Sequence, residues 1–489
     1  MKNSSVASEP ERLDIHLIAV GGTGMAPLAC LLQGQGHQVR GSDKPLYPPM
    51  STLLDGAGIV PRVGYDPAHL DPPPDLVVVG NAVPRDNPEA VEAERLAAGG
   101  VLERISMPQA LWRFFLDGRH RVVAAGTHGK TTTTAMAAWV WTDCGADPSY
   151  LIGGLPKDLP ESFHEGGGDD FLVEGDEYNA AYFDRGPKFL HYRPDTLILT
   201  SVEYDHADLY PSHEELLAAY RELVASVPDD GIVIGCGDTP ELRELVREAA
   251  GCRVVLYGFD PEVNDVAPEG GLALTPDATS FTLVDRFGEE GARERVTVEL
   301  AVPGRHNAAN ALGVYLAARH RGLPAADVAR ALGRFRGVAR RLDELGTARG
   351  VTVVDDFAHH PTAVTESLAA LGHRYPSRRL VALFEPRSLT AGRAFLHCDY
   401  ARAFQGADRV LFAPFFYADR FEEDERLDFG SLCRELKAKG VDSHCCDSVE
   451  EVLERAVDEA REGDVVVTMS SGSFEGLPHR MLETLRERS

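Results

Sequence analysis

The sequence is short of positive charge. It has 49 Lys and Arg residues against 76 Asp and Glu residues, a formal net charge of −27 at pH 7. A nucleic-acid duplex or an anionic membrane surface must be met by a clustered basic face. The longest basic runs are the pairs Arg340-Arg341 and Arg378-Arg379. The composition therefore argues against nucleic-acid and membrane partners.

Long apolar runs are missing as well. No stretch approaches the ~20 residues that cross a bilayer. Glu9, Glu11 and Asp14 stand where a signal peptide needs an apolar segment. The eight cysteines are scattered without a C-x-x-C pair, which is typical of free thiols in a reducing compartment. These features predict a cytoplasmic protein.

The remaining composition is that of a globular chain. Its hydrophobic share of 44% and charged share of 26% are ordinary for packed domains, and 489 residues suggest two to four domains. Apolar strands alternate with helices along most of the chain, which predicts an α/β fold. Alternating short strands between residues 267 and 302 predict an antiparallel insertion. Polar or Gly-containing breaks near residues 118 and 338 predict three domains: 1–117, 118–337 and 338–489.

The strongest motif is a Gly-rich turn at residues 126–132, between a predicted strand ending at Ala125 and a predicted helix. The turn reads Gly126, Thr127, His128, Gly129, Lys130, Thr131 and Thr132. Glycines let backbone N–H groups face phosphates, Lys130 neutralises the β/γ oxygens, and the Thr131 hydroxyl is suited to Mg²⁺. The usual spacing needs Gly at position 124, where this chain has Ala. A purely structural turn is the alternative, but the strand and helix around it favour a nucleotide site, and the lack of an Asn-Lys-x-Asp guanine motif favours ATP.

Acidic residues follow two of the predicted strands. Residues 173–178 include Glu174, and residues 203–208 include His206 among further carboxylates. Mg²⁺ bound to phosphates usually takes one or two protein carboxylates, and open α/β sheets bind ligands at this edge. Either acidic segment alone is typical of a solvated loop. Together with the Gly-rich turn, they predict a magnesium–nucleotide site.

These segments resemble the ATP-dependent Mur ligases, which join an amino acid or peptide to a UDP-muramoyl precursor of peptidoglycan. The resemblance covers nearly the whole chain and includes the Gly-rich turn, Glu174, Asp205-His206, Arg340-Arg341 and residues 305–307 and 355–361. Within the family, residues 47–54, 80–88, 188–194 and 385–388 resemble the recycling branch. That branch attaches L-alanyl-γ-D-glutamyl-meso-diaminopimelate to UDP-N-acetylmuramate.

The resemblance implies a Rossmann-like N-terminal domain for the UDP sugar, a central P-loop domain for ATP and a Rossmann-like C-terminal domain for the incoming amine. It implies Lys130 on phosphate, Thr131 and Glu174 on one Mg²⁺ and His206 on a second. It also implies His306 and Asn307 near adenine, Asp355 near the ribose, Arg341 on the transferring phosphate and Arg387 on a carboxylate of the peptide. The implied substrate-binding residues are Gly22, Thr23, Gly24, Met25, Ser42, Asp43, Asn81, His359 and Arg387.

One departure from the family concerns a lysine. Several members carry a carbamylated lysine some fifteen residues after the metal histidine, but this chain has no lysine between Lys188 and Lys437. The muramate-joining branches lack it too, so the gap agrees with the assignment. It leaves the ligands of a second metal open.

The Gly-rich turn near the N-terminus permits three interpretations. Gly22 and Gly24, with Asp43 about twenty residues later, suggest a dinucleotide fingerprint, but Pro27 replaces its third glycine. A plain tight turn is the second interpretation. The third, which we favour, is a cradle for the UDP pyrophosphate.

Other functions remain as alternatives. His359-His360 is either a catalytic base, because histidine titrates near neutrality, or a pair that shapes the loop before Pro361. The nearest alternative activity is a UDP-N-acetylmuramate–L-alanine ligase. An ATP-binding regulatory protein without ligase activity and a dehydrogenase are more distant, and the sequence leaves the oligomeric state open.

Overall fold

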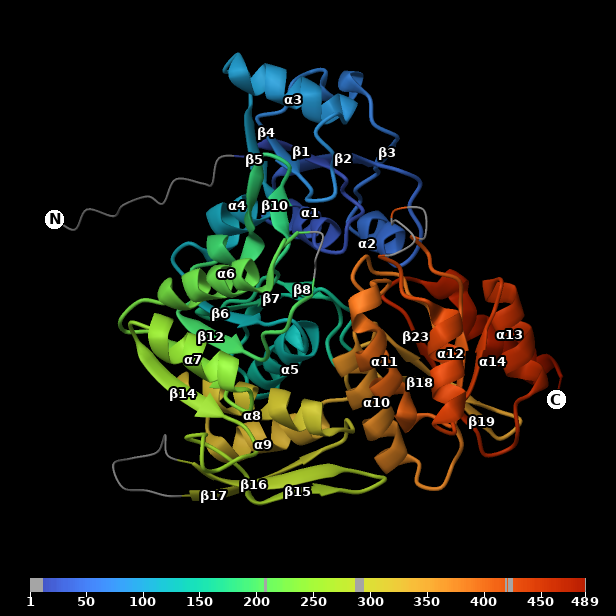
Figure 1. The fold of residues 1–489 in the computed structure, drawn as a ribbon. Coiled ribbons are helices and arrows are strands. Elements are labelled where there is room, and N and C mark those ends of the chain that lie inside the picture. The colour runs from blue at the N-terminus through green and yellow to red at the C-terminus, as the bar shows by residue number, and fades with distance from the viewer. Residues whose placement is uncertain (1–11, 206–208, 286–293, 418–419, 421–424, 489) are drawn as a thin grey trace. The chain divides into compact units, whose positions relative to one another are not determined.

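The computed structural model describes residues 12–205, 209–285, 294–417, 420 and 425–488 (Figure 1). The chain divides into two compact units. The first contains residues 1–123, 147–153 and 161–194, and the second contains residues 124–146, 154–160 and 195–489. We describe each unit separately.

The first unit begins with a parallel sheet of five strands in the order β3-β2-β1-β4-β5. Strands β1 and β4 at its centre are mostly apolar and buried, and in β4 all four residues are. Such runs are typical of parallel strands whose two faces are both covered. The strands are β1 (Asp14–Ile18), β2 (Gln38–Asp43), β3 (Arg62–Val63), β4 (Leu76–Val79) and β5 (Glu103–Ser106); the helices are α1 (Met25–Gly34), α2 (Met50–Gly56), α3 (Pro88–Ala98) and α4 (Met107–Leu111).

The rest of this unit contributes strands to a second sheet. Strand β9 (Asp170–Gly175) pairs in parallel with β7 (Ser149–Leu151), which pairs antiparallel with β8 (Phe163–His164). A separate hairpin is formed by β10 (Asn179–Ala181) and β11 (Asp184–Pro187). Strand β6 (His120–Ala125) lies next to β9 and continues into the second unit.

In the second unit the sheet order is β6-β12-β13-β14. Helix α8 packs on α5 and on strands β12 and β13, so the Gly-rich turn before α5 is attached to a buried layer. The strands are β12 (Thr196–Leu199), β13 (Ile232–Cys236) and β14 (Arg253–Tyr257); the helices are α5 (Lys130–Asp143), α6 (His213–Ala225), α7 (Pro240–Ala249), α8 (Arg305–His320) and α9 (Ala325–Arg334).

The predicted insertion is a three-stranded antiparallel sheet. It has the order β15-β16-β17. The strands are β15 (Glu269–Leu274), β16 (Thr279–Asp285) and β17 (Glu294–Leu300). Alternate residues of β16 are buried, as expected for a sheet with one covered face.

The last part of the second unit is a six-stranded sheet in the order β18-β19-β23-β20-β21-β22, parallel except for β18. Two apolar clusters cover it. One contains buried residues of α10, α11 and α12, and the other contains residues of α13 and α14. The strands are β18 (Asp343–Ala348), β19 (Val351–Asp356), β20 (Leu380–Phe384), β21 (Arg409–Phe412), β22 (Asp442–Cys445) and β23 (Val465–Met469); the helices are α10 (Pro361–Arg374), α11 (His397–Ala403), α12 (Phe429–Ala438), α13 (Val449–Asp458) and α14 (Leu477–Glu487).

The predicted α/β class, the parallel sheets and the antiparallel insertion are confirmed. None of the helices within the described residues is both long and apolar enough for a bilayer span.

Candidate functional site

The Gly-rich turn joins the end of β6 to the first residue of α5. Gly126 has φ 132° and Gly129, the N-cap of α5, has φ 84°. A Cβ at Gly126 would lie 2.3 Å from Thr200 Oγ1, and one at Gly129 would lie 2.8 Å from Asn310 Oδ1. Both positions therefore require glycine. The helix N-terminus then has no side chain at its cap, an arrangement suited to an anion.

Lys130 lies over this turn. Its Nζ donates to the carbonyl of Gly126 at 2.8 Å and to that of Thr127 at 3.3 Å. Its ammonium group is therefore held at the mouth of the turn, where the sequence places the β/γ oxygens of ATP.

The turn is attached to the segment after β12. The Thr127 hydroxyl donates to the carbonyl of Glu203 at 3.1 Å and accepts from the Glu203 N–H at 2.8 Å. The His128 N–H donates to Ser201 Oγ at 3.0 Å. These contacts fix the loop without a ligand, and they assign the Thr127 side chain to the loop rather than to solvent. Thr132, in the first turn of α5, is half-buried.

Arg341 reaches the same turn from much later in the chain. Its Nη2 lies 3.4 Å from Thr131 Oγ1, and its guanidinium lies 4.3 Å from the ring centre of Phe357. The residues on either side, Arg340 and Leu342, have φ 61° and 49°. The structure thus brings the Arg341 guanidinium to the first turn of α5.

Two of the predicted magnesium ligands, Thr131 and Glu174, are oxygen donors, the type that Mg²⁺ prefers. Thr131 lies in the first turn of α5, and Glu174 is half-buried near the end of β9. Gly153 leaves room for Glu174, because a Cβ there would lie 1.6 Å from Glu174 Oε1. The donor set fits a hard divalent cation. His206 lies outside the described residues.

The residues expected near the nucleoside are partly buried in protein contacts. His306 Nδ1 lies 3.6 Å from Glu366 Oε2, and Asn307 Nδ2 donates to the Pro303 carbonyl at 2.7 Å. Asp355 accepts from Thr468 Oγ1 at 3.0 Å. Burial raises the pKa of Asp355.

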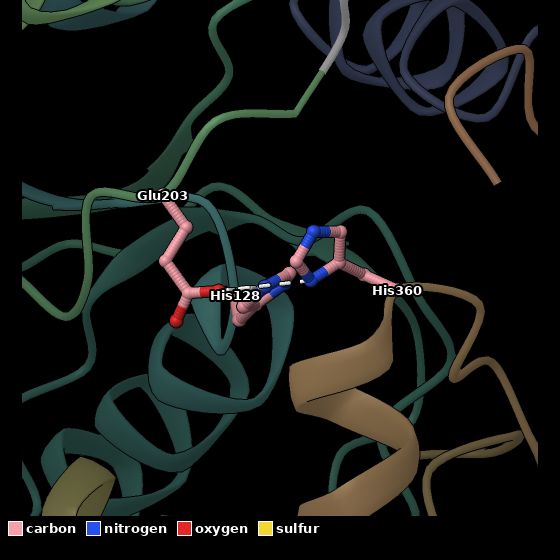
Figure 2. A group of neighbouring side chains, drawn as sticks. All are labelled: His128, Glu203 and His360. Carbon is pink, nitrogen blue, oxygen red and sulfur yellow. Dashed lines mark ion pairs between the residues drawn. The ribbon is translucent and has the colours of Figure 1, made fainter. Parts of the chain in front are cut away.

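A cluster that the sequence does not predict lies beside the turn. His128, Glu203 and His360 come from the Gly-rich turn, the segment after β12 and the N-cap of α10, and Figure 2 shows both imidazoles beside the carboxylate. Glu203 Oε2 lies 3.5 Å from His128 Nε2 and 3.6 Å from His360 Nδ1. It also accepts from Thr362 Oγ1 at 2.6 Å. We call this group the His-Glu-His cluster.

Burial and charge set the ionisation of the cluster. Burial alone would raise the pKa of Glu203, but His128, Thr362 and His360 lower it to about 2. Burial and the nearby His128 lower the pKa of His360 to about 4, despite the opposing charges of Asp205 and Glu203. Near neutral pH, Glu203 is therefore a carboxylate and His360 a neutral imidazole.

Two further residues of the expected substrate-binding set, His359 and Arg387, lie in the second unit. His359 Nδ1 donates to the Phe357 carbonyl at 3.0 Å, and its Nε2 lies 3.9 Å from Asp205 Oδ2. The Arg387 guanidinium lies 3.9 Å from the ring centre of Phe416. Its Nη1 lies 3.5 Å from Glu385 Oε1.

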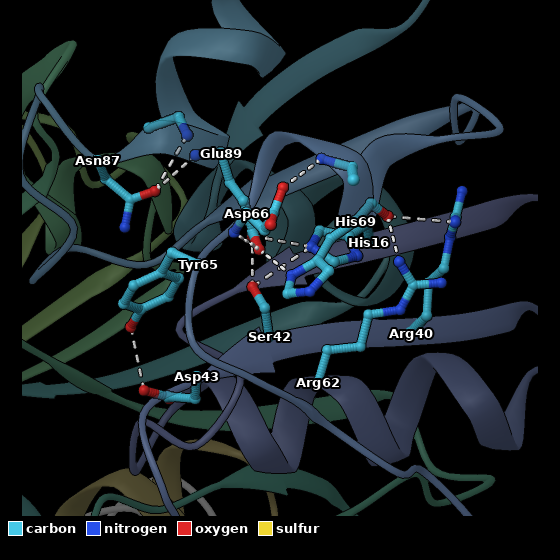
Figure 3. Close-up of polar contacts among 12 residues, drawn as sticks. His16, Arg40, Ser42, Asp43, Arg62, Tyr65, Asp66, His69, Asn87 and Glu89 are labelled. Atoms are coloured by element: carbon cyan, nitrogen blue, oxygen red, sulfur yellow. Dashed lines mark hydrogen bonds and ion pairs between the residues drawn. The ribbon is translucent and has the colours of Figure 1, made fainter.

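The N-terminal turn is supported by Asp43. This carboxylate accepts from the Gly21 N–H at 2.8 Å and from the Tyr65 hydroxyl at 3.0 Å. Ser42 is fully buried, and its hydroxyl donates to Glu89. His16 and His69 also contact Glu89, so Figure 3 shows a carboxylate surrounded by hydrogen-bonding groups. Asp43 thus holds the turn, whereas the Ser42 hydroxyl belongs to the group around Glu89.

The other residues of this unit that are expected to bind substrate differ in their solvent exposure. Gly22, Thr23 and Asn81 are exposed and Gly24 is half-buried, whereas the Met25 side chain is buried. Met25 is the first residue of α1, so its backbone, and not its side chain, lies at the helix N-terminus.

The contribution of His360 and Thr362 to the His-Glu-His cluster is not predicted from the sequence. In the sequence, His360 stands out only as half of a His-His pair, and Thr362 does not stand out. The available signal is their position soon after the apolar run 351–354, because parallel sheets gather functional side chains at the carboxyl ends of their strands.

Comparison with protein families gives three successive matches. Residues 14–111 match the Mur ligase family catalytic domain, residues 124–318 the Mur ligase middle domain, and residues 340–472 the Mur ligase glutamate ligase domain.

Individual relatives cover nearly the whole chain. The UDP-N-acetylmuramate–L-alanyl-γ-D-glutamyl-meso-2,6-diaminoheptandioate ligase of Escherichia coli is 38% identical, over 97% of this chain and 99% of its own length. The UDP-N-acetylmuramate–L-alanine ligase of Mycobacterium ulcerans is 33% identical, over 98% of this chain and 96% of its own. The crystal structure of a murein peptide ligase from Psychrobacter arcticus aligns with a TM-score of 0.72 and 32% identity, over 97% of this chain and 99% of that one. The chain belongs to the Mur ligase family and is a ligase.

Proposed function

We propose that this protein joins L-alanyl-γ-D-glutamyl-meso-diaminopimelate to the lactyl carboxylate of UDP-N-acetylmuramate, with ATP cleaved to ADP and phosphate, in peptidoglycan recycling. The observation that carries the phosphoryl-transfer chemistry is the meeting of Lys130, Thr131 and Arg341 at one Gly-rich turn. The choice of tripeptide is supported by the names of the Escherichia coli relative and the Psychrobacter arcticus structure.

The reaction needs an activated acid, because a carboxylate does not condense with an amine in neutral water. The carboxylate oxygen attacks the γ-phosphorus of ATP, forming an acyl phosphate and releasing ADP. The amine of the peptide then attacks the acyl carbon, and phosphate leaves with the transferred oxygen. Phosphoryl transfer depends mainly on positioning and charge neutralisation.

The chain's own residues provide both. Lys130 and Arg341 bring two positive charges to the turn, and the N-terminus of α5 adds partial positive charge. Thr131 and Glu174 would hold one Mg²⁺ and His206 would hold a second; Mg²⁺ neutralises phosphate charge when bound. In this proposal His306 and Asn307 contact adenine, Asp355 contacts the ribose and Arg387 contacts a peptide carboxylate.

We assign the N-terminal turn, with Asn81, to the UDP sugar. Exposed N–H groups at the start of α1 suit a pyrophosphate, and the Asp43 contact with Gly21 N–H holds the turn in shape. The domains would be residues 1–117 for UDP-N-acetylmuramate, 118–337 for ATP and 338–489 for the peptide. The site of action is the cytoplasm, where ATP is supplied.

An assay with exchanged amine substrates tests the proposal. The protein is given ATP, Mg²⁺ and UDP-N-acetylmuramate with either the tripeptide or L-alanine, and phosphate release is measured. We expect release with the tripeptide at a kcat/KM at least tenfold above that with L-alanine. The reverse preference would establish the second candidate, an L-alanine ligase, which the Mycobacterium ulcerans relative supports.

The acyl-phosphate step has its own test. With ¹⁸O in the lactyl carboxylate, one labelled oxygen should appear in the released phosphate. Unlabelled phosphate would refute the activation step, whichever amine is used. ATP hydrolysis without UDP-N-acetylmuramate or amine would instead favour a regulatory ATP-binding protein.

A further inference from the structure

The His-Glu-His cluster contains two buried nitrogen atoms without a hydrogen bond. Within the described residues, His128 Nε2 and His360 Nδ1 have no hydrogen-bond partner. His360 is only 8% exposed. Buried polar atoms are nearly always hydrogen-bonded. Two buried nitrogens without a hydrogen bond, both facing the carboxylate of Glu203, therefore need an explanation.

A simple hydrogen-bonded triad does not explain them. The separations of 3.5 and 3.6 Å from Glu203 Oε2 exceed those of N–H···O bonds, which are usually 2.7–3.2 Å. The same oxygen already accepts from Thr362 Oγ1 at 2.6 Å. The imidazoles therefore face the carboxylate across a gap.

The gap has the size of a coordination shell. Zinc lies about 2.0–2.2 Å from imidazole nitrogen and carboxylate oxygen, so two ligands of a tetrahedral site are about 3.4 Å apart. The two distances to Glu203 are close to that value. The ligand atoms of all three residues lie within 4.8 Å of one another.

We propose that His128, Glu203 and His360 form a binding site for a zinc-type divalent cation, with water as the fourth ligand. Two imidazoles and one carboxylate suit zinc and related transition metals, whereas Mg²⁺ takes oxygen ligands. The proposed site shares no residue with the predicted magnesium ligands Thr131, Glu174 and His206. Thr362 orients the carboxylate ligand, a role that outer-shell hydrogen bonds commonly fill.

The proposed site lies between two segments that are far apart in the sequence, so a bound cation would link them. His128 belongs to the Gly-rich turn, and His360 is the N-cap of α10. A bound cation would tie the phosphate loop, within residues 124–318, to a helix within residues 340–472, the ranges that match the middle and last family domains. The cation would therefore restrain the two segments against each other.

Cobalt is a suitable probe, because its visible absorption is much stronger in tetrahedral than in octahedral sites. The metal-free full-length protein is titrated with Co²⁺ in the presence of excess Mg²⁺, and Zn²⁺ is then added as a competitor. We expect one equivalent of tetrahedral Co²⁺, displaced by Zn²⁺. Absence of a tetrahedral spectrum would overturn the proposal.

Variants locate the site. Glu203→Gln and His360→Asn should weaken Zn²⁺ binding by more than about 100-fold, and Thr362→Val by about 10–100-fold, the range for outer-shell changes. The matched control is His444→Asn, since His444, Cys446 and Glu451 also lie within 4.8 Å of one another. Loss of binding in the control, with retention in Glu203→Gln, would overturn the proposal.

A direct measurement covers the case in which a cluster variant fails to fold. Crystals of the wild-type protein grown with Zn²⁺ should give an anomalous peak at the zinc edge between the three side chains. A peak elsewhere, or none, would refute the site. Metal binding is the readout in each experiment, so the result does not depend on the proposed ligase substrates.

Discussion

Arg341 Nη2 lies 3.4 Å from Thr131 Oγ1, although the two residues are 210 positions apart in the chain. The neighbouring Arg340 has a different environment, because its Nη2 donates to the backbone carbonyls of Ser470 and Gly472. Arg341 thus contacts the phosphate loop, whereas Arg340 supports the segment after the last strand of the C-terminal sheet.

These two arginines should separate activity from stability. Arg341→Ala should lower kcat by at least about 100-fold, the range for removing a charge-stabilising donor, with little change in Tm. Arg340→Ala should lower the free energy of unfolding by about 1.5–3 kcal/mol, the worth of hydrogen bonds from a charged donor. Steady-state kinetics and denaturant unfolding measure the two effects. If Arg341→Ala and Arg340→Ala lowered kcat at saturating substrate by the same factor and had the same free energy of unfolding, this division of roles would be contradicted.

Lys130→Ala should abolish measurable ADP formation while the protein stays folded. The lost ammonium group removes a positive charge from the turn, although the helix and its glycines remain. ADP release and circular dichroism are the measurements, and Lys439→Ala is the control, because Lys439 pairs with Glu435 on the exposed face of α12. Normal turnover in Lys130→Ala would refute the phosphate-loop assignment.

Gly153→Ala should disturb the proposed magnesium site through Glu174. The new methyl group would lie within bonding distance of Glu174 Oε1, so the carboxylate must move. We expect the Mg²⁺ concentration for half-maximal activity to rise by about tenfold or more, as when metal ligands lose their orientation. Gly186→Ala is the matched control, since no heavy atom lies within 4 Å of its added Cβ. A magnesium titration that is identical for both variants would count against Glu174 as a ligand.

Glu89 should make the N-terminal sheet sensitive to acid. Burial alone would raise the pKa of this fully buried carboxyl, but contacts with His16, Ser42 and His69 together lower it below its usual value. Because the pKa of Glu89 is lower in the folded state, its ionisation stabilises the protein at pH values above the unfolded-state pKa of about 4.3. This stability is lost as the pH falls through the folded-state pKa.

The matching substitution is Glu89→Gln. It should cost about 1–3 kcal/mol at pH 7, as expected when buried hydrogen-bonding groups lose their acceptor. The stability difference from the wild type should shrink as the pH falls toward and below the folded pKa. Unfolding curves from pH 7 to pH 3 measure this trend, and a constant difference would contradict it.

The sequence predicts those parts of the fold that hydrophobic burial determines. Residues 76–79 and 380–384 are apolar runs, and they coincide with β4 and β20. Strand β15 is not predictable in this way, because two glycines and mostly exposed side chains leave no alternating pattern. Strand β22 is similarly polar, and its pairing with β21 supplies what its own sequence does not show.

The site shows the same limit. The Gly-rich turn is predictable because the backbone geometry requires glycine at Gly126 and Gly129. The motif therefore appears as a run of neighbouring residues in the sequence. The His-Glu-His cluster is not, because its members come from three segments that only tertiary folding brings together. No local spacing rule relates His128 to Glu203 or to His360.

The backbone beside Arg341 has a consequence for how firmly that side chain is aimed. Arg340 and Leu342 both adopt left-handed conformations, which cost a residue with a side chain about 1–2 kcal/mol each. Glycine at position 342 would remove part of this penalty, and the chain would gain conformational freedom around the arginine. The chain thus adopts a locally unfavourable backbone on both sides of Arg341, and this restricts the directions in which the guanidinium can point.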